Sequence, residues 1–477
     1  MSGQKDALDD LIKILGSEKV KTDQVSLLSY ARDIYPLGYL ELREGKISHL
    51  PWAVCFPEKI EEVSAVILWA RQEQIPLIPY GAGSGVLAGA VPIDGGVVVD
   101  LKRMNRIRSI NPINLTCEAE AGILGEVLER ELNQKGFTLG HFPASMYCST
   151  LGGWLSTRSA GQLSAKYGKI EDLVIALEGV LADGSIFRTQ ATPRSATGPD
   201  LDQVLLGSEG TLAIITSALI SIHHLPRVRF YRGFQFSELK PGLEAMRLLM
   251  QKDLSPSLLR LYDELDTKFN SQKLGVPASG CLLIAGFEGV DPEMVELKSR
   301  MGWEIISELG GKDLGEEPGK RWLEHRYSVS YQQSRILTQP NTLLDTIEVS
   351  ISWARALELY NLVMERIKNL GLIMAHFSHA WREGVCIYFS LLLTGNNSEE
   401  LRDAHQEVWE LVMESVLSLG GSISHHHGIG YHRGKWLKRE LGEGHKILEG
   451  IKKRLDPAFV LNPGKLGFSL SEEKDGN

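Results

Sequence analysis

The spacing of apolar residues changes repeatedly between a helical and a strand period along the first half of the chain. Leu8, Leu11, Ile12 and Leu15 recur at helical intervals, whereas Ile75–Ile78 is a short continuous apolar run typical of a buried strand. The elements expected here are helices at 6–15, 57–69 and 124–132 and strands at 75–78, 96–100 and 115–119.

A predicted hairpin and a long β-rich stretch complete this first region. Val174–Val180 and Ile186–Arg188 flank the turn Ala182–Ser185, whose glycine suits a hairpin. Ala213–Ile222 is an apolar stretch rich in β-formers, and the region is expected to close near Pro226.

After Pro226 the two periods return in a different order. Strands are expected at 230–236, 282–287 and 385–393, and helices at 239–250, 292–302, 361–370 and 399–419. Strand–helix–strand units of this kind predict a second α+β domain. The expected division is an N-terminal helical segment at 1–48, a first domain at 49–226, a second domain at 227–455 and a tail at 456–477 that returns to the first domain.

Composition and charge exclude some classes of partner but say little about the fold. The 477 residues are 43% hydrophobic and 23% charged, with a net charge of -9 and a pI near 5.9. Nucleic acid or an anionic membrane is therefore not expected as the main partner. The polar, acidic N-terminus is unlike a secretory signal, and no apolar run is long enough for a membrane span, so the cytoplasm is the expected location. Five scattered cysteines are expected to be thiols.

A glycine-rich turn follows the predicted strand at 75–78. In Pro79–Gly85, three glycines and a serine leave bare backbone N–H groups that can surround a phosphate or pyrophosphate. Such turns are common without any ligand, so this one alone does not identify a cofactor. Further segments follow in a fixed order, and they are His141–Ser145, Ser149–Trp154, Ser156–Gly161, Lys166–Gly168 with Glu171–Asp172, and Gly207–Leu212. Together they resemble the FAD-binding domain of the vanillyl-alcohol-oxidase type.

The densest cluster of ionisable side chains lies at Ser424–Gly430, where His425, His426 and His427 are consecutive. Three adjacent side chains cannot share one face of a strand or helix, so at least one is expected to point into a site. Imidazole can donate or accept a proton near neutrality. A surface loop is the alternative, but the neighbouring glycines favour a loop that approaches a ligand closely.

Two further positions are candidates for chemistry. Tyr388 lies in a predicted apolar strand, where it is either a core residue with a hydrogen-bonded hydroxyl or a proton donor facing the flavin. Arg335 has apolar neighbours, where a guanidinium needs an anionic partner. That partner is either an internal carboxylate, such as Asp345 or Glu348, or the phosphate or carboxylate of a substrate.

The C-terminal segments resemble one branch of this flavoprotein family, the alkylglycerone-phosphate synthases (alkyl-dihydroxyacetone-phosphate synthases). The resemblance covers about residues 50–465 and is strongest at Gly152–Asp172, Ser195–Asp200, Gly207–Ile215 and Ser424–Gly430. The related FAD-linked D-lactate, glycolate and 2-hydroxyglutarate dehydrogenases usually have a glutamate where this chain has His426. The resemblance implies an α+β fold: a two-part vanillyl-alcohol-oxidase-type (PCMH-type) FAD-binding domain plus an α+β substrate or cap domain.

The resemblance also implies which residues bind FAD. The glycine-rich turn would hold the pyrophosphate, and the later loops would surround the isoalloxazine ring. The implied cofactor-binding residues are Pro79, Tyr80, Gly81, Ala82, Gly83, Ser84, Gly85, Ala144, Ser145, Ser149, Thr150, Gly152, Gly153, Thr157, Arg158, Ser159, Ala160, Glu209, Gly210, Thr211 and Ile215. Noncovalent FAD is expected, because the family binds it noncovalently and no histidine lies in the turn.

The same resemblance implies a reaction. Tyr388 matches the family's catalytic acid, His425, His426 and His427 match its essential histidines, and Arg335 falls near its substrate-phosphate arginine. In the synthases the reduced-flavin N5 forms an adduct with the substrate carbon, the fatty acid leaves, and a fatty alcohol replaces it to make an ether lipid. The protein would clamp the phosphate, supply protons and exclude water.

Two positions depart from the synthases, which carry an arginine where this chain has His376 and lack the histidines found here at 376 and 379. His376, His379 and His426 are therefore candidate ligands of a divalent metal, because imidazole suits zinc. The alternative function is an FAD-linked oxidoreductase of a small 2-hydroxy acid such as D-lactate or glycolate, with Arg335 on the carboxylate and a histidine as base.

Partners follow from whichever reaction applies. Both reactions take an anionic small-molecule substrate, and the oxidoreductase would also need an electron acceptor: a quinone, an electron-transfer flavoprotein or oxygen. Dimerisation is common in the wider family, but nothing in the composition argues for a homodimer. A flavin-binding protein without catalysis is a third, weaker hypothesis, because a proton-transfer cluster has little use without chemistry.

Overall fold

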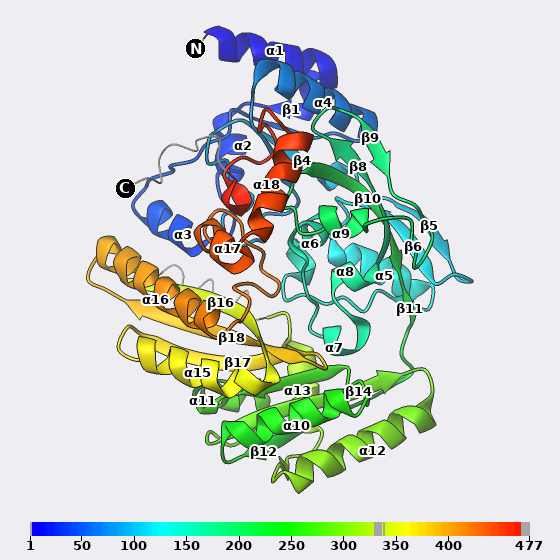
Figure 1. The fold of residues 1–477 in the computed structure, drawn as a ribbon, viewed down its shortest axis with the longest axis vertical. Coiled ribbons are helices and arrows are strands. Elements are labelled where there is room, and N and C mark those ends of the chain that lie inside the picture. Colours follow the sequence, from blue (N-terminus) through cyan, green and yellow to red (C-terminus); the bar gives the residue numbers. More distant parts are fainter. Residues whose placement is uncertain (1, 329–335, 337–338, 469–477) are drawn as a thin grey trace.

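The structure is a computed structural model that describes residues 2–328, 336 and 339–468. Figure 1 shows two parts stacked along the long axis. The first half of the chain forms one end and a broad sheet from the second half forms the other. Near the C-terminus, α17 (Gly434–Leu441) is followed by α18 (Gly444–Leu455), which lies back against the first half, where Lys452 of α18 donates to the carbonyl of Thr211 (Figure 1).

The first sheet has the strand order β1-β2-β4-β3, with parallel pairing of β2 with β4 and of β4 with β3. Its strands are β1 (Val20–Lys21), β2 (Ala53–Cys55), β3 (Leu77–Tyr80) and β4 (Val97–Asp100), and the helices of this region are α1 (Ser2–Leu15), α2 (Gln24–Ser29), α3 (Pro36–Arg43) and α4 (Ile60–Glu73). Apolar faces of α1 and α4 share one core with the sheet. Gln74 ends α4 in a left-handed conformation (φ 55°), so β3 begins at Leu77, two residues later than the apolar run predicts.

The second sheet is antiparallel, with the order β5-β6-β10-β8-β9. Its strands are β5 (Ile107–Asn111), β6 (Thr116–Glu120), β8 (Val174–Leu181), β9 (Ile186–Arg188) and β10 (Ala213–Ser221); β7 (Phe137–Thr138) pairs separately with β11 (His223–His224). The accompanying helices are α5 (Gly125–Gln134), α6 (Leu151–Thr157), α7 (Ser164–Tyr167), α8 (Ile170–Leu173) and α9 (Leu201–Leu205). The predicted hairpin is confirmed, since β8 and β9 pair antiparallel.

The third sheet has seven antiparallel-paired strands in the order β15-β12-β14-β13-β17-β18-β16. They are β12 (Val228–Phe236), β13 (Leu258–Tyr262), β14 (Cys281–Gly289), β15 (Lys312–Asp313), β16 (Thr342–Ser352), β17 (Leu372–Ala380) and β18 (Gly384–Thr394). The helices of this part are α10 (Leu239–Gln251), α11 (Glu264–Leu274), α12 (Pro292–Glu308), α13 (Glu317–His325), α15 (Trp353–Ile367) and α16 (Ser398–Ser418).

The two faces of this third sheet have different surroundings. Ile387, Phe389 and Leu391 of β18 are fully buried in a core that includes residues of α10, α12, α15 and α16. The intervening Tyr388 and Ser390 line a cavity on the opposite face. The strand period of two therefore separates packing residues from site residues.

The C-terminal segment contacts the first sheet and its loops. The N–H of Leu77 donates to the carbonyl of Val460 (2.7 Å), and the N–H of Asn462 donates to the carbonyl of Leu77 (2.8 Å). The side chain of Asn462 donates to the carbonyls of Gly89 and Glu209. Residues 460–462 therefore brace the loops beside the cavity.

Most of the predicted elements are present, with shifted ends. Helix α12 ends six residues later than the apolar pattern predicts, and α15 begins eight residues earlier. Strands β13, β16 and β17 were not predicted, although they form the centre and one edge of the third sheet. No helix within the described residues is long and apolar enough to cross a membrane.

Candidate active site

A cavity of about 570 Å³ lies between the two parts of the molecule. One wall consists of glycine-rich and small-residue loops of the first half. The other wall is the face of the third sheet that carries Tyr388 and Ser390. Its volume is within the range typical of small-molecule and cofactor sites. The cavity brings together nearly all of the sequence-predicted site residues.

The glycine-rich turn at 81–85 lines the cavity and is shaped for close approach of a ligand. A Cβ on Gly81 would lie 2.3 Å from Oγ1 of Thr150, and Gly83 has a φ of 65° that favours glycine. None of the hydrogen bonds between described residues is donated by a backbone N–H of 81–85. These N–H groups are therefore available to a pyrophosphate, and the turn fits FAD.

Small side chains from α6 and the loop before it continue this wall. Thr150 caps α6 by accepting from the N–H of Gly153 (3.3 Å), so the helix begins at the cavity. The first-half residues expected to bind FAD that line the cavity are Pro79, Tyr80, Gly81, Ala82, Gly83, Ser84, Gly85, Ala144, Ser145, Ser149, Thr150, Gly152, Gly153, Thr157, Ser159, Ala160, Glu209, Gly210 and Ile215.

Arg158 and Thr211 were also expected to bind FAD, but neither is among the lining residues. Arg158 donates to the backbone carbonyls of Leu206 (3.1 Å) and Gln203 (2.6 Å). Thr211 is fully buried, and its hydroxyl donates to the carbonyl of Ser208. Both side chains support the loops behind the wall rather than face the space where a ligand would lie.

On the opposite wall, strand register places the polar side chains in rows. Tyr388 is paired across strands with His376 on one side and with Glu348 on the other. The rings of His376 and Tyr388 stack with centroids 4.7 Å apart. Burial raises the pKa of Tyr388 to about 12, so its hydroxyl keeps its proton at neutral pH and can act as a proton donor.

His376 is held between a carboxyl group and a guanidinium group. Its Nδ1 lies 3.0 Å from Oδ2 of Asp266, and its Nε2 lies 2.8 Å from Nη2 of Arg260. Burial and the neighbouring guanidinium keep the pKa of His376 well below its usual value. A neutral ring that donates from Nδ1 to Asp266 accepts the hydrogen bond from Arg260 at Nε2. His376 therefore orients Arg260, whose guanidinium lines the cavity.

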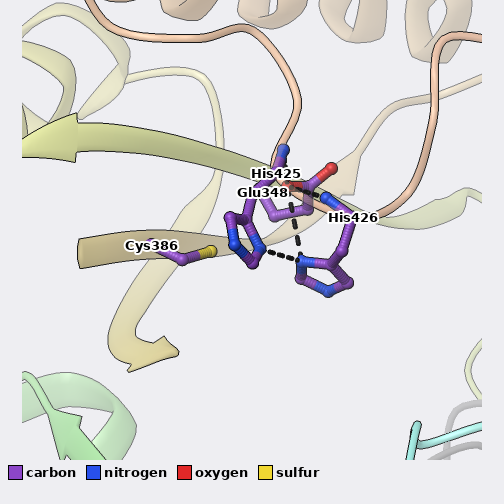
Figure 2. Close-up of side chains that lie close together, drawn as sticks. All are labelled: Glu348, Cys386, His425 and His426. Atoms are coloured by element: carbon purple, nitrogen blue, oxygen red, sulfur yellow. Dashed lines mark hydrogen bonds and ion pairs between the residues drawn. The ribbon is translucent and has the colours of Figure 1, made fainter. Parts of the chain in front are cut away.

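The three consecutive histidines form a turn around Glu348, and Figure 2 shows His425 and His426 beside this carboxylate. The carboxylate accepts from the backbone N–H groups of His425 (2.5 Å), His426 (3.2 Å) and His427 (3.0 Å), and from Nη1 of Arg433 (2.6 Å). Burial opposes ionisation of Glu348, but the Arg433 guanidinium and these donors more than offset it, so its pKa is lowered.

This turn directs the imidazoles differently. His426 and His427 line the cavity, whereas His425 does not. The His425 ring instead packs on Trp381, with centroids 4.6 Å apart, and its Nδ1 lies 2.9 Å from Nδ1 of His426. Burial lowers the pKa of all three imidazoles, so they are neutral at physiological pH.

One group of potential metal ligands occurs among the described residues: Glu348, Cys386, His425 and His426, whose ligand atoms lie within 4.8 Å of one another. Figure 2 shows the Cys386 sulfur directed toward His425. Glu348 is already neutralised by Arg433, and burial raises the pKa of the Cys386 thiol well above its usual value. This set differs from the one expected from the sequence, since His376 and His379 are not in it.

His379 faces the first half of the chain from a β-bulge. The register between β17 and β18 shifts between Ser378 and Ala380, and His379 has a φ of 55°. Bulges re-aim side chains, and here Nδ1 of His379 lies 2.8 Å from Oγ of Ser164. Burial lowers the pKa of His379 to about 3. The hydrogen bond joins the two walls of the cavity.

Known protein families match both halves of the chain. The family model described as "FAD binding domain" matches residues 51–190, and the model described as "FAD linked oxidases, C-terminal domain" matches residues 225–466. The second match alone covers more than half of the chain. The chain belongs to the FAD-linked oxidase family. It is accordingly an FAD-dependent flavoenzyme with the PCMH-type fold that the sequence predicts.

Relatives within this family differ in their named activities. The chain is 29% identical to an alkyldihydroxyacetonephosphate synthase of Dictyostelium discoideum, over 96% of this chain and 80% of that one. It is 32% identical to the uncharacterized FAD-linked oxidoreductase YgcU of Escherichia coli, over 96% and 97%. It is 27% identical to the glycolate oxidase subunit GlcD of Bacillus subtilis, over 97% of each. A solved alkyldihydroxyacetonephosphate synthase matches with a TM-score of 0.81 at 26% identity, over 96% of this chain and 84% of that one.

Several residues of this FAD-linked oxidase site were not predicted. Arg335 lies outside the described residues, whereas Arg260, Asp266 and Lys273 line the cavity without having been singled out. The criterion applied to Arg335, a guanidinium among apolar neighbours, also fits Arg260 in the run Leu258–Tyr262. Glu348 was named only as a possible internal partner of Arg335, and in the structure its carboxylate accepts from Arg433 and the histidine turn.

Proposed function

We propose that this FAD-linked oxidase-family enzyme exchanges the acyl chain of an acyl-dihydroxyacetone phosphate for a fatty alcohol, as in alkylglycerone-phosphate synthases. The proposal is supported by a change from apolar to polar side chains along one wall of the cavity. Leu344, Leu392 and Leu372, here called the leucine row, are cross-strand partners and line the cavity together. Two rows further along the strands lie His376 and Tyr388, so an apolar end and a polar end share one face.

The polar end can bind a phosphate. Arg260 and Lys273 both line the cavity, and burial together with the charge of Arg260 lowers the pKa of Lys273. Two cations close enough to affect each other's ionisation are stabilised by a shared anion. Asp266, through His376, would hold the Arg260 guanidinium in place for the phosphate oxygens.

The apolar end can bind a long hydrocarbon chain. Met374 extends the leucine row toward the polar end, and Phe269 also lines the cavity. Leu372 and Phe269 are 46% and 63% exposed, so the apolar surface reaches the cavity mouth. A small 2-hydroxy acid would leave this apolar surface in contact with water, whereas an acyl or alkyl chain would cover it.

The reaction breaks the bond between the acyl oxygen and the substrate carbon and forms a bond from that carbon to the alcohol oxygen. A fatty acid leaves and the alcohol loses its proton, so the overall exchange has no net oxidation. Bound FAD would supply the ring that activates the exchanging carbon. Tyr388 would donate a proton to the acyl oxygen as the fatty acid leaves, and neutral His426 or His427 would accept the alcohol proton, so the exchange neither gains nor loses protons overall.

A second candidate is an FAD-linked oxidoreductase of a small 2-hydroxy acid, assisted by a divalent metal. It is favoured by the similarity to GlcD and by the clustered ligand atoms of His425, His426 and Cys386. Glu348 weighs against it, because Arg433 and three backbone N–H groups already compensate its charge.

The proposal is tested by incubating FAD-replete enzyme with acyl-dihydroxyacetone phosphate and a fatty alcohol, and by measuring the ether product and free fatty acid by mass spectrometry. Equal amounts of both products from wild type, and none from Tyr388→Phe, are expected. Oxidation of D-lactate or glycolate with an artificial electron acceptor, without ether formation, would replace the proposal by the second candidate.

A further inference from the structure

The loop that carries the three histidines is fixed at both ends by buried carboxylates. Glu348 accepts from the backbone N–H groups of residues 425, 426 and 427. Glu209 accepts from the N–H of Ile429 (2.6 Å) and of Gly430 (2.8 Å). Five of six successive residues thus donate their amide hydrogens to two side chains.

The two carboxylates come from opposite walls of the cavity. Glu348 lies on β16 of the third sheet and is 0% exposed; Glu209 lies in the loop before β10 and is 7% exposed. Glu209 has a φ of 49°, in a region that non-glycine residues rarely occupy. Such a conformation persists only where surrounding contacts enforce it, and Glu209 makes those contacts with the histidine loop.

The loop has little room to adopt another path. Gly428 has a φ of 85°, and a Cβ on it would lie 2.7 Å from Oε1 of Glu209. Arg433 donates to both Glu348 and the carbonyl of Gly428, so it ties the first carboxylate to the middle of the loop. Charge-assisted hydrogen bonds therefore hold the backbone of the loop at both ends.

We propose that Glu209 and Glu348 are positioning residues that act through the histidine loop and hold His426 and His427 against the cavity. Glu209 and its neighbour Gly210 also line the part of the cavity expected to hold the flavin. Glu209 therefore couples the flavin-side loop to the histidine loop, and the histidines are held in register with the cofactor. This inference rests on the proposed function only in the choice of reaction for measuring kcat.

Hydrogen–deuterium exchange of the FAD-replete protein tests the inference without any substrate. Glu348→Gln and Glu209→Gln each place an amide N–H₂ against backbone donors. We expect faster exchange confined to peptides covering 425–430, together with a kcat lower by about tenfold to a hundredfold and an unchanged KM, since a small misplacement of a reacting group has an effect of this size.

Glu440→Gln is the matched control. Glu440 also accepts a backbone N–H, that of Ile423 (2.7 Å), but it lies outside the loop and does not line the cavity. Its variant should leave the exchange of 425–430 and kcat unchanged. Wild-type exchange in both Glu348→Gln and Glu209→Gln would overturn the inference, as would accelerated exchange spread over the whole protein.

A measurement on the wild-type protein covers the case in which neither variant folds. Peptides covering 425–430 should exchange as slowly as the strands of the third sheet, and exchange as fast as in exposed loops would overturn the inference. If these amides are protected but no ether product forms, the proposed function is wrong and the positioning role of the two glutamates is retained. If ether forms but the amides are unprotected, the positioning role is wrong and the proposed function is retained.

Discussion

The imidazole of His376 and the ring of Tyr388 lie face to face across β17 and β18, with their centroids 4.7 Å and their planes 15° apart. Each ring restricts the other, and Asp266 and Arg260 fix His376 from the opposite side. The proton donor and the cation that would bind the substrate phosphate are thus parts of one rigid array.

Tyr388→Phe removes the hydroxyl and keeps the stack. Turnover should fall by about a hundredfold to ten-thousandfold, the range for loss of a general acid, while FAD stays bound. Flavin absorbance of the purified variant and its rate of ether formation check both points. Loss of FAD would instead assign Tyr388 a structural role.

Arg260→Lys should raise KM for the phosphate substrate by about tenfold to a hundredfold, because an ammonium cannot reproduce the fork that bonds both His376 and an anion. Steady-state kinetics at varied substrate concentration measure the effect. Arg232→Lys is the control, since Arg232 pairs with Asp313 away from the cavity. Equal KM values for the two variants would remove Arg260 from the substrate site.

Leu392→Trp enlarges the centre of the leucine row. The rate with a long-chain fatty alcohol should fall by about tenfold more than the rate with a short-chain alcohol, since roughly 1–3 kcal/mol of discrimination is typical of an altered apolar pocket. Leu297→Trp, at an exposed position of α12, should not change this ratio. A ratio unaffected by Leu392→Trp would show that the chain lies elsewhere.

His379→Asn tests the lowered pKa of about 3 at this buried imidazole. The unfolded chain takes up a proton near pH 6.5 and the folded chain does not, so the contribution of neutral His379 to stability is complete above pH 6.5 and is lost as the pH falls toward 3. Asparagine tolerates the φ of 55° at this position.

The measurement is the free energy of unfolding of both proteins in urea between pH 4 and 6. The variant should depend on pH less steeply than wild type by about 1.4 kcal/mol per pH unit, the value for one proton. Buried carboxylates with raised pKa, such as Asp266 (about 6), act in the opposite direction but are common to both proteins. Identical slopes would mean that His379 is protonated in the folded state.

Chelation distinguishes the two candidate functions. Because the charge of Glu348 is already compensated by Arg433, treatment with a chelator followed by desalting should leave ether formation unchanged. Activity that is lost on chelation and restored by zinc or manganese would instead support metal-assisted chemistry at His425, His426 and Cys386.

Local patterns in the sequence predicted most of the elements and the loops, but not how distant strands combine. The run at 385–393 was predicted as a strand, with Tyr388 either in the core or facing the flavin. The pairing of β18 with β16 and β17 depends on long-range register. Short sequence segments therefore could not predict the leucine row or the hydrogen bonds between Glu348 and the histidines. Arg260 and Asp266 meet His376 for the same reason.

The most direct test of the proposed exchange is an anaerobic experiment with the flavin-replete enzyme, in which visible flavin absorbance and products are followed together. With acyl-dihydroxyacetone phosphate and a fatty alcohol, we expect ether and fatty acid in equal amounts without net bleaching of the flavin. With D-lactate, glycolate or D-2-hydroxyglutarate we expect no bleaching. Stoichiometric bleaching by one of these acids, and no ether from the lipid substrates, would rule out the proposed exchange.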